Sequence, residues 1–198
     1  MRKTQTAQAT MAPITRSIRR TAACLVATLA AVAGAADEER MNRGHDPFSQ
    51  VSNALAACPP PRGPMQTPAE WRAEAHSRIE RGTSCWMEGR CRLHNAYLYD
   101  AEIAESVQRR LASLAPRLPW AQQSSLWFML QRRVVYVQGC VAPGFDRLQL
   151  LRELEKTADV ETVVDQTFVN EAGQAPPYAV AASSAAEAPP PPAPAPQR

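Results

Sequence analysis

The side chains with the most distinctive chemistry in this sequence are five cysteines, of which Cys24 lies in an N-terminal segment that we expect to be removed. The four that remain, an even number in a chain whose N-terminus indicates export, are typical of two disulfides and allow three pairings. We favour Cys85 with Cys91, because residues 86–90 can form a tight loop between them, and Cys58 with Cys140. The second bond would attach the N-terminal part of the chain to its centre.

A metal site is the alternative use of the same residues. Thiolate and imidazole groups are ligands that zinc prefers, and Cys85, Cys91, His94 and His76 carry them. The spacing C-x5-C-x2-H is not that of a standard zinc finger, and an oxidising compartment favours disulfides. The sequence also has no C-x-x-C-H motif for covalent haem, so we expect no metal ion and no other cofactor.

Residues that could carry out catalysis are sparse. The motifs G-x-S-x-G and H-E-x-x-H are absent from the sequence, as are glycine loops that bind phosphate. Glu70 and Glu74 lie one helical turn apart, but Glu70 is placed to cap a helix. The C-x5-C spacing also differs from the C-x-x-C of disulfide oxidoreductases. We therefore expect a protein that is not an enzyme.

The N-terminus has the composition of a secretory signal peptide. Basic residues without any acid precede an apolar stretch, Thr21 to Ala33, which is shorter than the roughly 20 apolar residues that span a bilayer. Small residues follow at Ala33-Gly34-Ala35, so we expect cleavage after Ala35 or Ala36 and a periplasmic location. An uncleaved anchor is the alternative.

Removal of residues 1–36 changes the net charge. The chain has 22 basic and 19 acidic residues, and five of the basic ones lie in this segment. The remainder has 17 basic against 19 acidic residues, a net charge of −2 with histidine neutral. A general nucleic-acid binder would show a basic stripe or cluster, so we expect no nucleic-acid partner.

Composition divides the remaining chain into three parts. Residues 37–99 are rich in loops and contain five of the cysteines and histidines discussed above, whereas residues 100–170 have the strongest apolar periodicity. Residues 171–198 are rich in alanine and proline and have too few large apolar side chains to offset the entropy lost on ordering. We expect this tail to be disordered and partly polyproline II.

One helix is expected within residues 37–99. Thr67 is its N-cap, Pro68 occupies the first helical position, and Glu70 completes a capping box. We expect Gly82 to end the helix. Its apolar stripe recurs every four residues, at Trp71, Ala75 and Ile79.

The central part predicts the order helix, strand, strand, helix, strand. We expect Asp100 to cap the first helix and residues 125–130 and 134–141 to pair as a hairpin around Gln131-Arg132-Arg133. A helix over residues 145–156 and a strand over 160–169 follow. The expected core positions are Ile103, Val107, Leu111 and Leu114 of the first helix and Leu148, Leu151 and Leu154 of the second. The predicted fold class is α+β, an αββαβ module in which two helices pack on a three-stranded sheet.

This central part resembles a BON domain, a small module of bacterial envelope proteins. The resemblance rests on Asp100-Ala101-Glu102-Ile103, on Leu126-x-Phe128-x-Leu130, on Val135-x-Val137-x-Gly139-x-Val141, and on Val160-x2-Val163-Val164-Asp165. The family has the αββαβ arrangement. The hairpin turn departs from the glycine-containing turn that is usual in the family. A glycine within a strand, such as Gly139, marks a bulge or the close approach of another backbone.

The resemblance implies attachment to phospholipid membranes, with roles in envelope integrity or protection from stress. The residues suited to such a surface are four arginines for anionic headgroups and one tryptophan for the interface, namely Arg109, Arg110, Arg132, Arg133 and Trp127. The alternative is that Glu102 and Glu105 pair with Arg109 while the other side chains are merely solvated or packed. The partner is then an anionic membrane or, if the chain is an adaptor or chaperone, another envelope protein.

Overall fold

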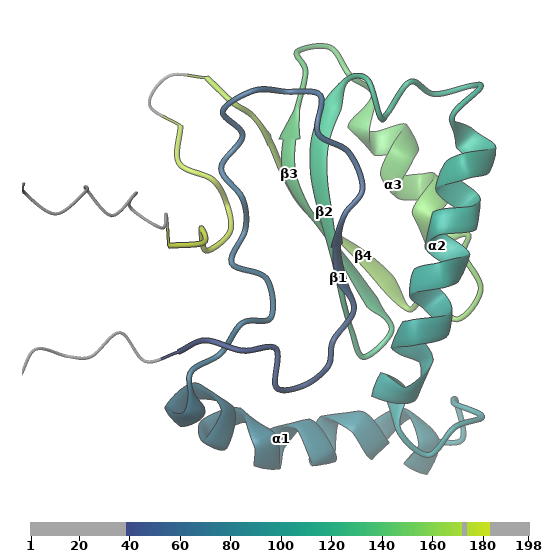
Figure 1. Cartoon of the computed structure of the whole chain (residues 1–198). Helices are drawn as coiled ribbons and strands as arrows, with labels where there is room; N and C mark the ends of the chain where they lie inside the picture. The colour runs from purple at the N-terminus through teal and green to yellow at the C-terminus, as the bar shows by residue number, and fades with distance from the viewer. Residues whose placement is uncertain (1–38, 172–173, 183–198) are drawn as a thin grey trace, which may run out of the picture. The chain divides into compact units, whose positions relative to one another are not determined.

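The computed structural model describes residues 39–171 and 174–182 of the chain (Figure 1). The signal peptide expected over residues 1–36 lies outside these residues. The fold is α+β, with one four-stranded sheet in the order β1-β2-β3-β4. Its elements are β1 (Phe48–Gln50), α1 (Pro68–Met87), the 3-10 helix η1 (Ala96–Tyr99), α2 (Asp100–Leu114), β2 (Ser124–Gln131), β3 (Val134–Val141), α3 (Arg147–Glu155) and β4 (Thr162–Val169).

The sheet has one strand more than the sequence predicted. Strands β2 and β3 form the expected antiparallel hairpin, and β4 pairs with β3 in parallel after the α3 crossover. The order α2-β2-β3-α3-β4 is therefore the predicted αββαβ. The expectation of three strands was wrong because β1, from the N-terminal segment, pairs antiparallel with β2. A strand of only three residues is too short to show an alternating pattern.

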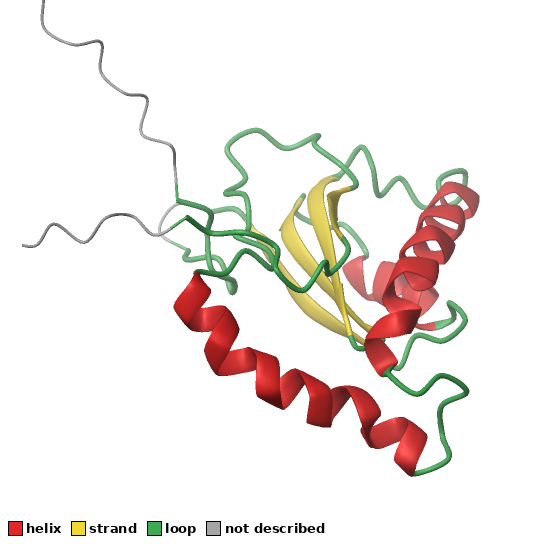
Figure 2. Ribbon diagram, turned by 60° about the horizontal axis from the view of Figure 1, so that its bottom comes forward, coloured by secondary structure: helices red, strands yellow, loops and turns green. Residues whose placement is uncertain are grey.

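Helices α2 and α3 pack on one face of the sheet, and α1 lies apart from them (Figure 2). The four positions expected to face the core on α2 are all buried. On α3 the buried residues are Leu150 and Leu154, whereas Leu148, which we expected to be buried, is 57% exposed. Leu148 lies in the first turn of α3, after the N-cap Asp146. The core cluster includes Leu126, Phe128, Leu130, Val135 and Val137 from the hairpin.

A second, smaller core lies around the disulfide between Cys58 and Cys140, whose Cα atoms are 5.8 Å apart. The rings of Phe168 and Tyr178 meet there edge to face, 6.0 Å apart. The Tyr178 hydroxyl donates to the carbonyl of Pro59 at 2.7 Å. The prediction of disorder from residue 171 onward is therefore wrong for residues 174–182, because this tyrosine supplies the buried apolar area that the surrounding alanines and prolines lack. Residues 183–198 lie outside the described part.

Helix α1 begins as the sequence predicted, with Thr67 as N-cap and both bonds of the capping box present. It does not end at Gly82 but continues to Met87, and Gly89, at φ 71°, follows its end. Gly82 instead allows the side chain of Asn95 to pack closely against α1, because a Cβ at this position would lie 2.6 Å from Oδ1 of Asn95. The predicted apolar stripe is not the buried face, since Ile79 is 65% exposed. The buried residues of α1 are Arg78, Gly82 and Cys85.

Candidate functional site

The turn between β2 and β3 is hydrogen-bonded to a buried carboxylate, that of Asp100. Arg132 and Arg133 both have positive φ, 55° and 66°, as the central residues of a tight hairpin turn of the primed type require. Their backbone N–H groups donate to the two carboxylate oxygens of Asp100, at 2.8 and 2.7 Å. The expectation that Asp100 caps α2 was therefore wrong, because its side chain faces the turn and makes no cap bond.

The environment of Asp100 changes its acidity. The residue is only 2% exposed. Burial raises the pKa of its carboxyl group to about 6, although the bonds from the backbone of Arg133 and Arg132 oppose this shift. The carboxylate thus compensates two backbone donors that no strand can satisfy at the end of a hairpin.

Of the two turn arginines, Arg133 has a structural role. Its Nε donates to the carbonyl of Asp159 at 2.8 Å, and its Nη1 lies 2.9 Å from Sγ of Cys91. The guanidinium also lies over the ring of Tyr99, 5.2 Å from the centroid, and its side chain is only 15% exposed. These contacts join the hairpin to the disulfide loop, so little of Arg133 is left for a ligand.

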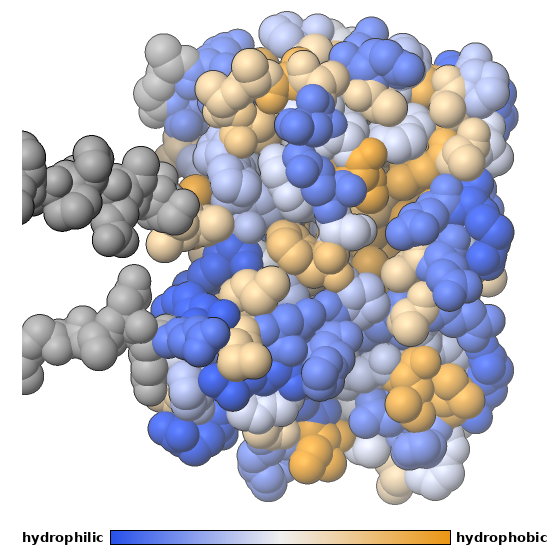
Figure 3. Space-filling view, in the orientation of Figure 1, coloured by the Kyte–Doolittle hydropathy of each residue, from blue (hydrophilic) through white to orange (hydrophobic). Residues whose placement is uncertain are grey.

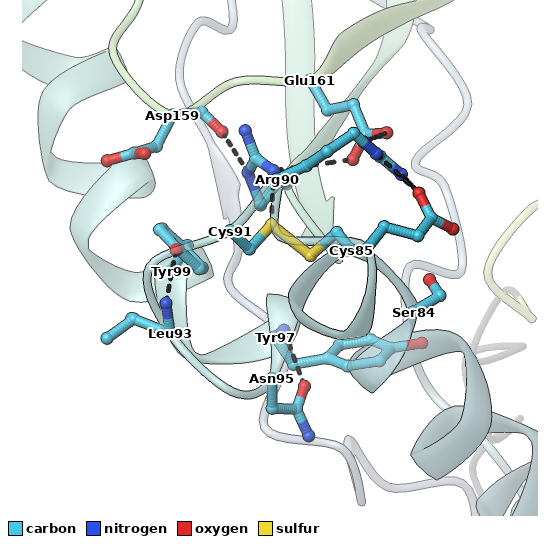
Figure 4. Close-up of a disulfide and its surroundings, with 12 residues drawn as sticks. Ser84, Cys85, Arg90, Cys91, Leu93, Asn95, Tyr97, Tyr99, Asp159 and Glu161 are labelled. Carbon is cyan, nitrogen blue, oxygen red and sulfur yellow. Dashed lines mark hydrogen bonds and ion pairs between the residues drawn. A yellow bond between two sulfur atoms is a disulfide. The ribbon is translucent and has the colours of Figure 1, made fainter.

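The disulfide between Cys85 and Cys91 forms the pair that the spacing favoured, and it closes the loop after α1 (Figure 4). The same bond excludes the alternative zinc site, because a sulfur in a disulfide is not a thiolate ligand. His76, another member of that set, is well exposed and pairs with Glu80. Within residues 39–171 and 174–182, no group of three or more histidine, cysteine or acidic side chains is placed to hold a metal ion.

Beside this disulfide is a cleft of about 140 Å³ between α1 and the hairpin turn, which we call the arginine cleft. It is lined by three basic residues, Arg81, Arg90 and Arg132. Ser84 and one carboxylate, that of Glu161, also line it. Arg90 pairs with Glu88 at 2.6 Å and lies 3.8 Å from Glu161. Figure 4 shows Arg90 beside the disulfide, with Glu161 near its guanidinium group.

The three arginines of the cleft differ in how far they are neutralised. Arg81 lies 3.5 Å from Glu74, so its charge is partly balanced by a residue of its own helix. Arg132 has no ion pair with a carboxylate in the described part of the chain, and it lines a second, smaller cavity with Arg81, Tyr97 and Tyr136. Arg90 is paired with Glu88 and Glu161, so Arg132 is the arginine of the cleft whose charge no carboxylate of the described residues balances, and it is the one left for an oxygen-rich anion.

The other residues proposed for lipid contact are distributed elsewhere. Arg110 lies between two helices, 3.5 Å from Glu153 and 2.9 Å from the carbonyl of Lys156. Arg109 is exposed on α2 and contacts Ser106 and Glu105. Trp127 alternates with the core residues of β2 and so points to the sheet face opposite α2. The structure thus does not bring the five residues into one surface.

A buried ion pair, which the sequence analysis did not identify, attaches α1 to the N-terminal segment. Arg78 forms two bonds to the carboxylate of Asp46, at 2.6 and 3.0 Å, and both residues are buried. Gln131 of β2 donates to the same carboxylate at 2.5 Å. The guanidinium of Arg78 stacks 3.8 Å from the ring centroid of Tyr97. Neither residue carries a signal in the sequence, because arginine is usually exposed.

Comparison with known proteins provides no assignment for this site. No family model matches the chain, and neither the curated proteins nor the solved structures include one that matches it. Among the described helices, none has the length and apolar character needed to cross a membrane.

Proposed function

We propose that this chain is an exported protein of the cell envelope that associates peripherally with anionic phospholipid. The observation that carries the proposal is the arginine cleft, which is lined by three arginines and in which Arg132 forms no ion pair within the described residues, whereas Arg81 and Arg90 are paired with glutamates. Planar guanidinium groups bind phosphate oxygens through pairs of hydrogen bonds, which makes arginine well suited to a phosphodiester headgroup.

The location proposed for the protein has two supports. The N-terminal residues have the composition of a signal peptide. The two disulfides suit an oxidising compartment such as the periplasm.

The αββαβ order of α2, β2, β3, α3 and β4 is also the order of the BON domain, which the central sequence resembles. Within this proposal, Arg132 is the member of the original set that remains best placed for lipid, and Arg81 and Arg90 replace Arg109 and Arg110.

The test is cosedimentation with vesicles of phosphatidylglycerol mixed into phosphatidylcholine, against vesicles of phosphatidylcholine alone. We expect pelleting only with the anionic vesicles and a fall in binding as salt increases. Each basic side chain near a charged membrane surface contributes about 1 kcal/mol, so Arg81→Gln/Arg132→Gln should reduce partitioning roughly thirtyfold. The glutamine keeps most of the length of each side chain.

The matched control is Arg109→Gln/Arg117→Gln, which removes the same charge from exposed positions outside the cleft. We expect it to retain most of the binding. Equal losses in the two double variants would mean that net charge, and not the cleft, determines association. Absence of pelleting with every vesicle would exclude the lipid proposal.

A second candidate is a protein-binding adaptor of the same compartment. It is favoured by a separate observation, an open edge of β1 beside an apolar groove that shares no lining residue with the arginine cleft. The two functions use different residues and can be tested independently.

A further inference from the structure

Strand β1 has one edge without a neighbouring strand. It occupies the end of the sheet and pairs only with β2. The carbonyl of Pro47 and the N–H of Val51 bond to β2, at 2.9 Å each. Since alternate residues of an edge strand direct their backbone groups to opposite sides, those of Phe48 and Gln50 point away from the sheet. In the described residues, no loop or turn provides a backbone partner for them.

An apolar groove of about 330 Å³ lies along this edge, between β1 and α2. It is lined by Ser49 and Val51 from β1 and the residue after it, by Leu111 and Ala112 of α2, and by Trp120. Leu111 and Trp120 are 3% and 8% exposed, and the indole N–H of Trp120 donates to the carbonyl of Leu111 at 3.1 Å. This bond and the burial of both side chains attach Trp120 to α2. Figure 3 shows apolar surface in the hollow between these two elements, flanked by hydrophilic side chains.

The lining of the groove contains no charged side chain, because its remaining members are Gln50 and Gln108. The charged residues on the neighbouring turns of α2, Glu105 and Arg109, lie 3.8 Å apart and neutralise each other. A charged group placed in the groove would lose its hydration without gaining a partner. The groove therefore selects an uncharged, apolar side chain.

We propose that β1 and α2 together bind an extended, uncharged segment of a partner protein, which adds to the sheet as a further strand. The outward backbone groups of Phe48 and Gln50 would bond to the segment, and its alternate side chains would point toward α2 and enter the groove. The inference rests on the adaptor function proposed above and names its site and the chemistry of its partner. It is independent of the arginine cleft.

Two other occupants fit the site less well. Six of the last ten residues of the chain are prolines, which have no N–H to donate to a strand ladder. A second copy pairing through its own β1 would present Ser49 on the side of α2, and this small polar side chain would leave the apolar groove unfilled. A segment with a larger apolar residue at every second position can do both: its backbone can bond to the open edge of β1, and its apolar side chains can fill the groove.

The experiment measures binding of the full, disulfide-bonded chain to an array of uncharged decapeptides. Each peptide alternates threonine with one apolar residue type, and a matching array replaces every second threonine with proline. Gln50→Pro removes only the outward N–H of β1, a change that an edge strand tolerates, and Ala112→Arg places a charge in the groove. We expect each substitution to weaken binding at least tenfold, and the proline array to be bound weakly or not at all.

The controls are Gln50→Ala, which retains the N–H, and Ser113→Arg, which adds the same charge to the exposed residue beside Ala112 but outside the groove. Both should bind as the unaltered chain does. The proposal is overturned if no alternating peptide is retained, or if Gln50→Pro and Ala112→Arg bind normally. A concentration-dependent dimer that Gln50→Pro dissociates would instead assign the edge to a second copy.

The same variants separate the two proposed functions. Gln50→Pro and Ala112→Arg should pellet with phosphatidylglycerol vesicles as the unaltered chain does, whereas Arg81→Gln/Arg132→Gln should bind peptides normally. Each set of variants should thus lose one activity and retain the other, and an unaltered chain that shows only one of the two activities identifies which proposal has failed.

Discussion

The carboxylate of Asp100 and the backbone N–H of Arg133 lie 2.7 Å apart, and this bond couples the start of α2 to the turn that carries the arginine cleft. A second N–H, that of Arg132, donates to the other oxygen of the same carboxylate. The carboxylate of Asp100 thus stabilises the positive φ angles of two non-glycine residues, Arg132 and Arg133. A substitution at Asp100 should therefore alter the conformation of the hairpin turn that lines the arginine cleft.

We expect Asp100→Asn to destabilise the protein by about 1–3 kcal/mol, because the amide NH2 cannot accept the second backbone bond. Burial raises the pKa of Asp100 to about 6 from an ordinary value of 3.8. The folded state therefore binds the proton more tightly than the unfolded state does. Stability from this group is fully present below the ordinary pKa and is lost as pH rises through 6.

The substituted chain lacks this titration, so the difference in the free energy of unfolding between the two proteins should be greater at pH 5 than at pH 8. With a pKa of about 6 in the folded state and 3.8 in the unfolded state, the difference should change by about 1.4 kcal/mol between pH 5 and pH 8. Urea unfolding followed by circular dichroism at both pH values measures it. A difference that does not vary with pH would mean that Asp100 is ionised at the same pH in both states.

Gly139 should tolerate no side chain. Its φ is 128°, and a Cβ there would lie 2.1 Å from the carbonyl oxygen of Ser125 on β2. We expect Gly139→Ala to cost about 3 kcal/mol or more, from backbone strain and the clash together. Gly144→Ala is the matched control, since its φ is also positive, 80°, but nothing lies within 4 Å of the added atom. Its cost should be about 1 kcal/mol, as measured by chemical unfolding.

Much of the central module could be predicted from the sequence, because its signals are local. The helical repeat of Ile103, Val107 and Leu111 and the boundaries of β3 are confirmed. Strand β1 was not predicted. Its three residues pair with β2 because the neighbouring segments place them there, and no local pattern indicates this. A buried arginine such as Arg78 was missed because burial depends on a partner, Asp46, that is 32 positions away.

The arginine cleft was missed for the same reason. The sequence identified Arg132 as a candidate from its place in the predicted hairpin turn and from the lipid contact that the BON resemblance implies. Its neighbours Arg81 and Arg90 come from the end of α1 and the disulfide loop, and only the folded chain brings them to the turn. The capping box of α1 was predicted correctly because Thr67 and Glu70 lie within one turn.

The two disulfides should contribute unequally to stability. The bond between Cys58 and Cys140 closes a separation of 82 residues, whereas that between Cys85 and Cys91 closes only 6. The loss of chain entropy in the unfolded state predicts about 4 kcal/mol for the first and about 2 kcal/mol for the second. Unfolding of Cys58→Ala/Cys140→Ala and Cys85→Ala/Cys91→Ala should show this order. The reverse order would mean that local strain, and not loop length, determines the effect.

The ion pair between Asp46 and Arg78 should show strong coupling, because each group is buried and has the other as its main counter-charge. Removing one partner leaves an uncompensated charge, so Asp46→Asn and Arg78→Met should each cost about 3–5 kcal/mol. The double variant should cost less than the sum, with a coupling of about 2 kcal/mol or more. Arg72→Met, at an exposed position of α1, should change stability by less than about 0.5 kcal/mol. Additive costs in the double variant would show that the stacking of Arg78 on Tyr97, and not its bond to Asp46, holds α1 in place.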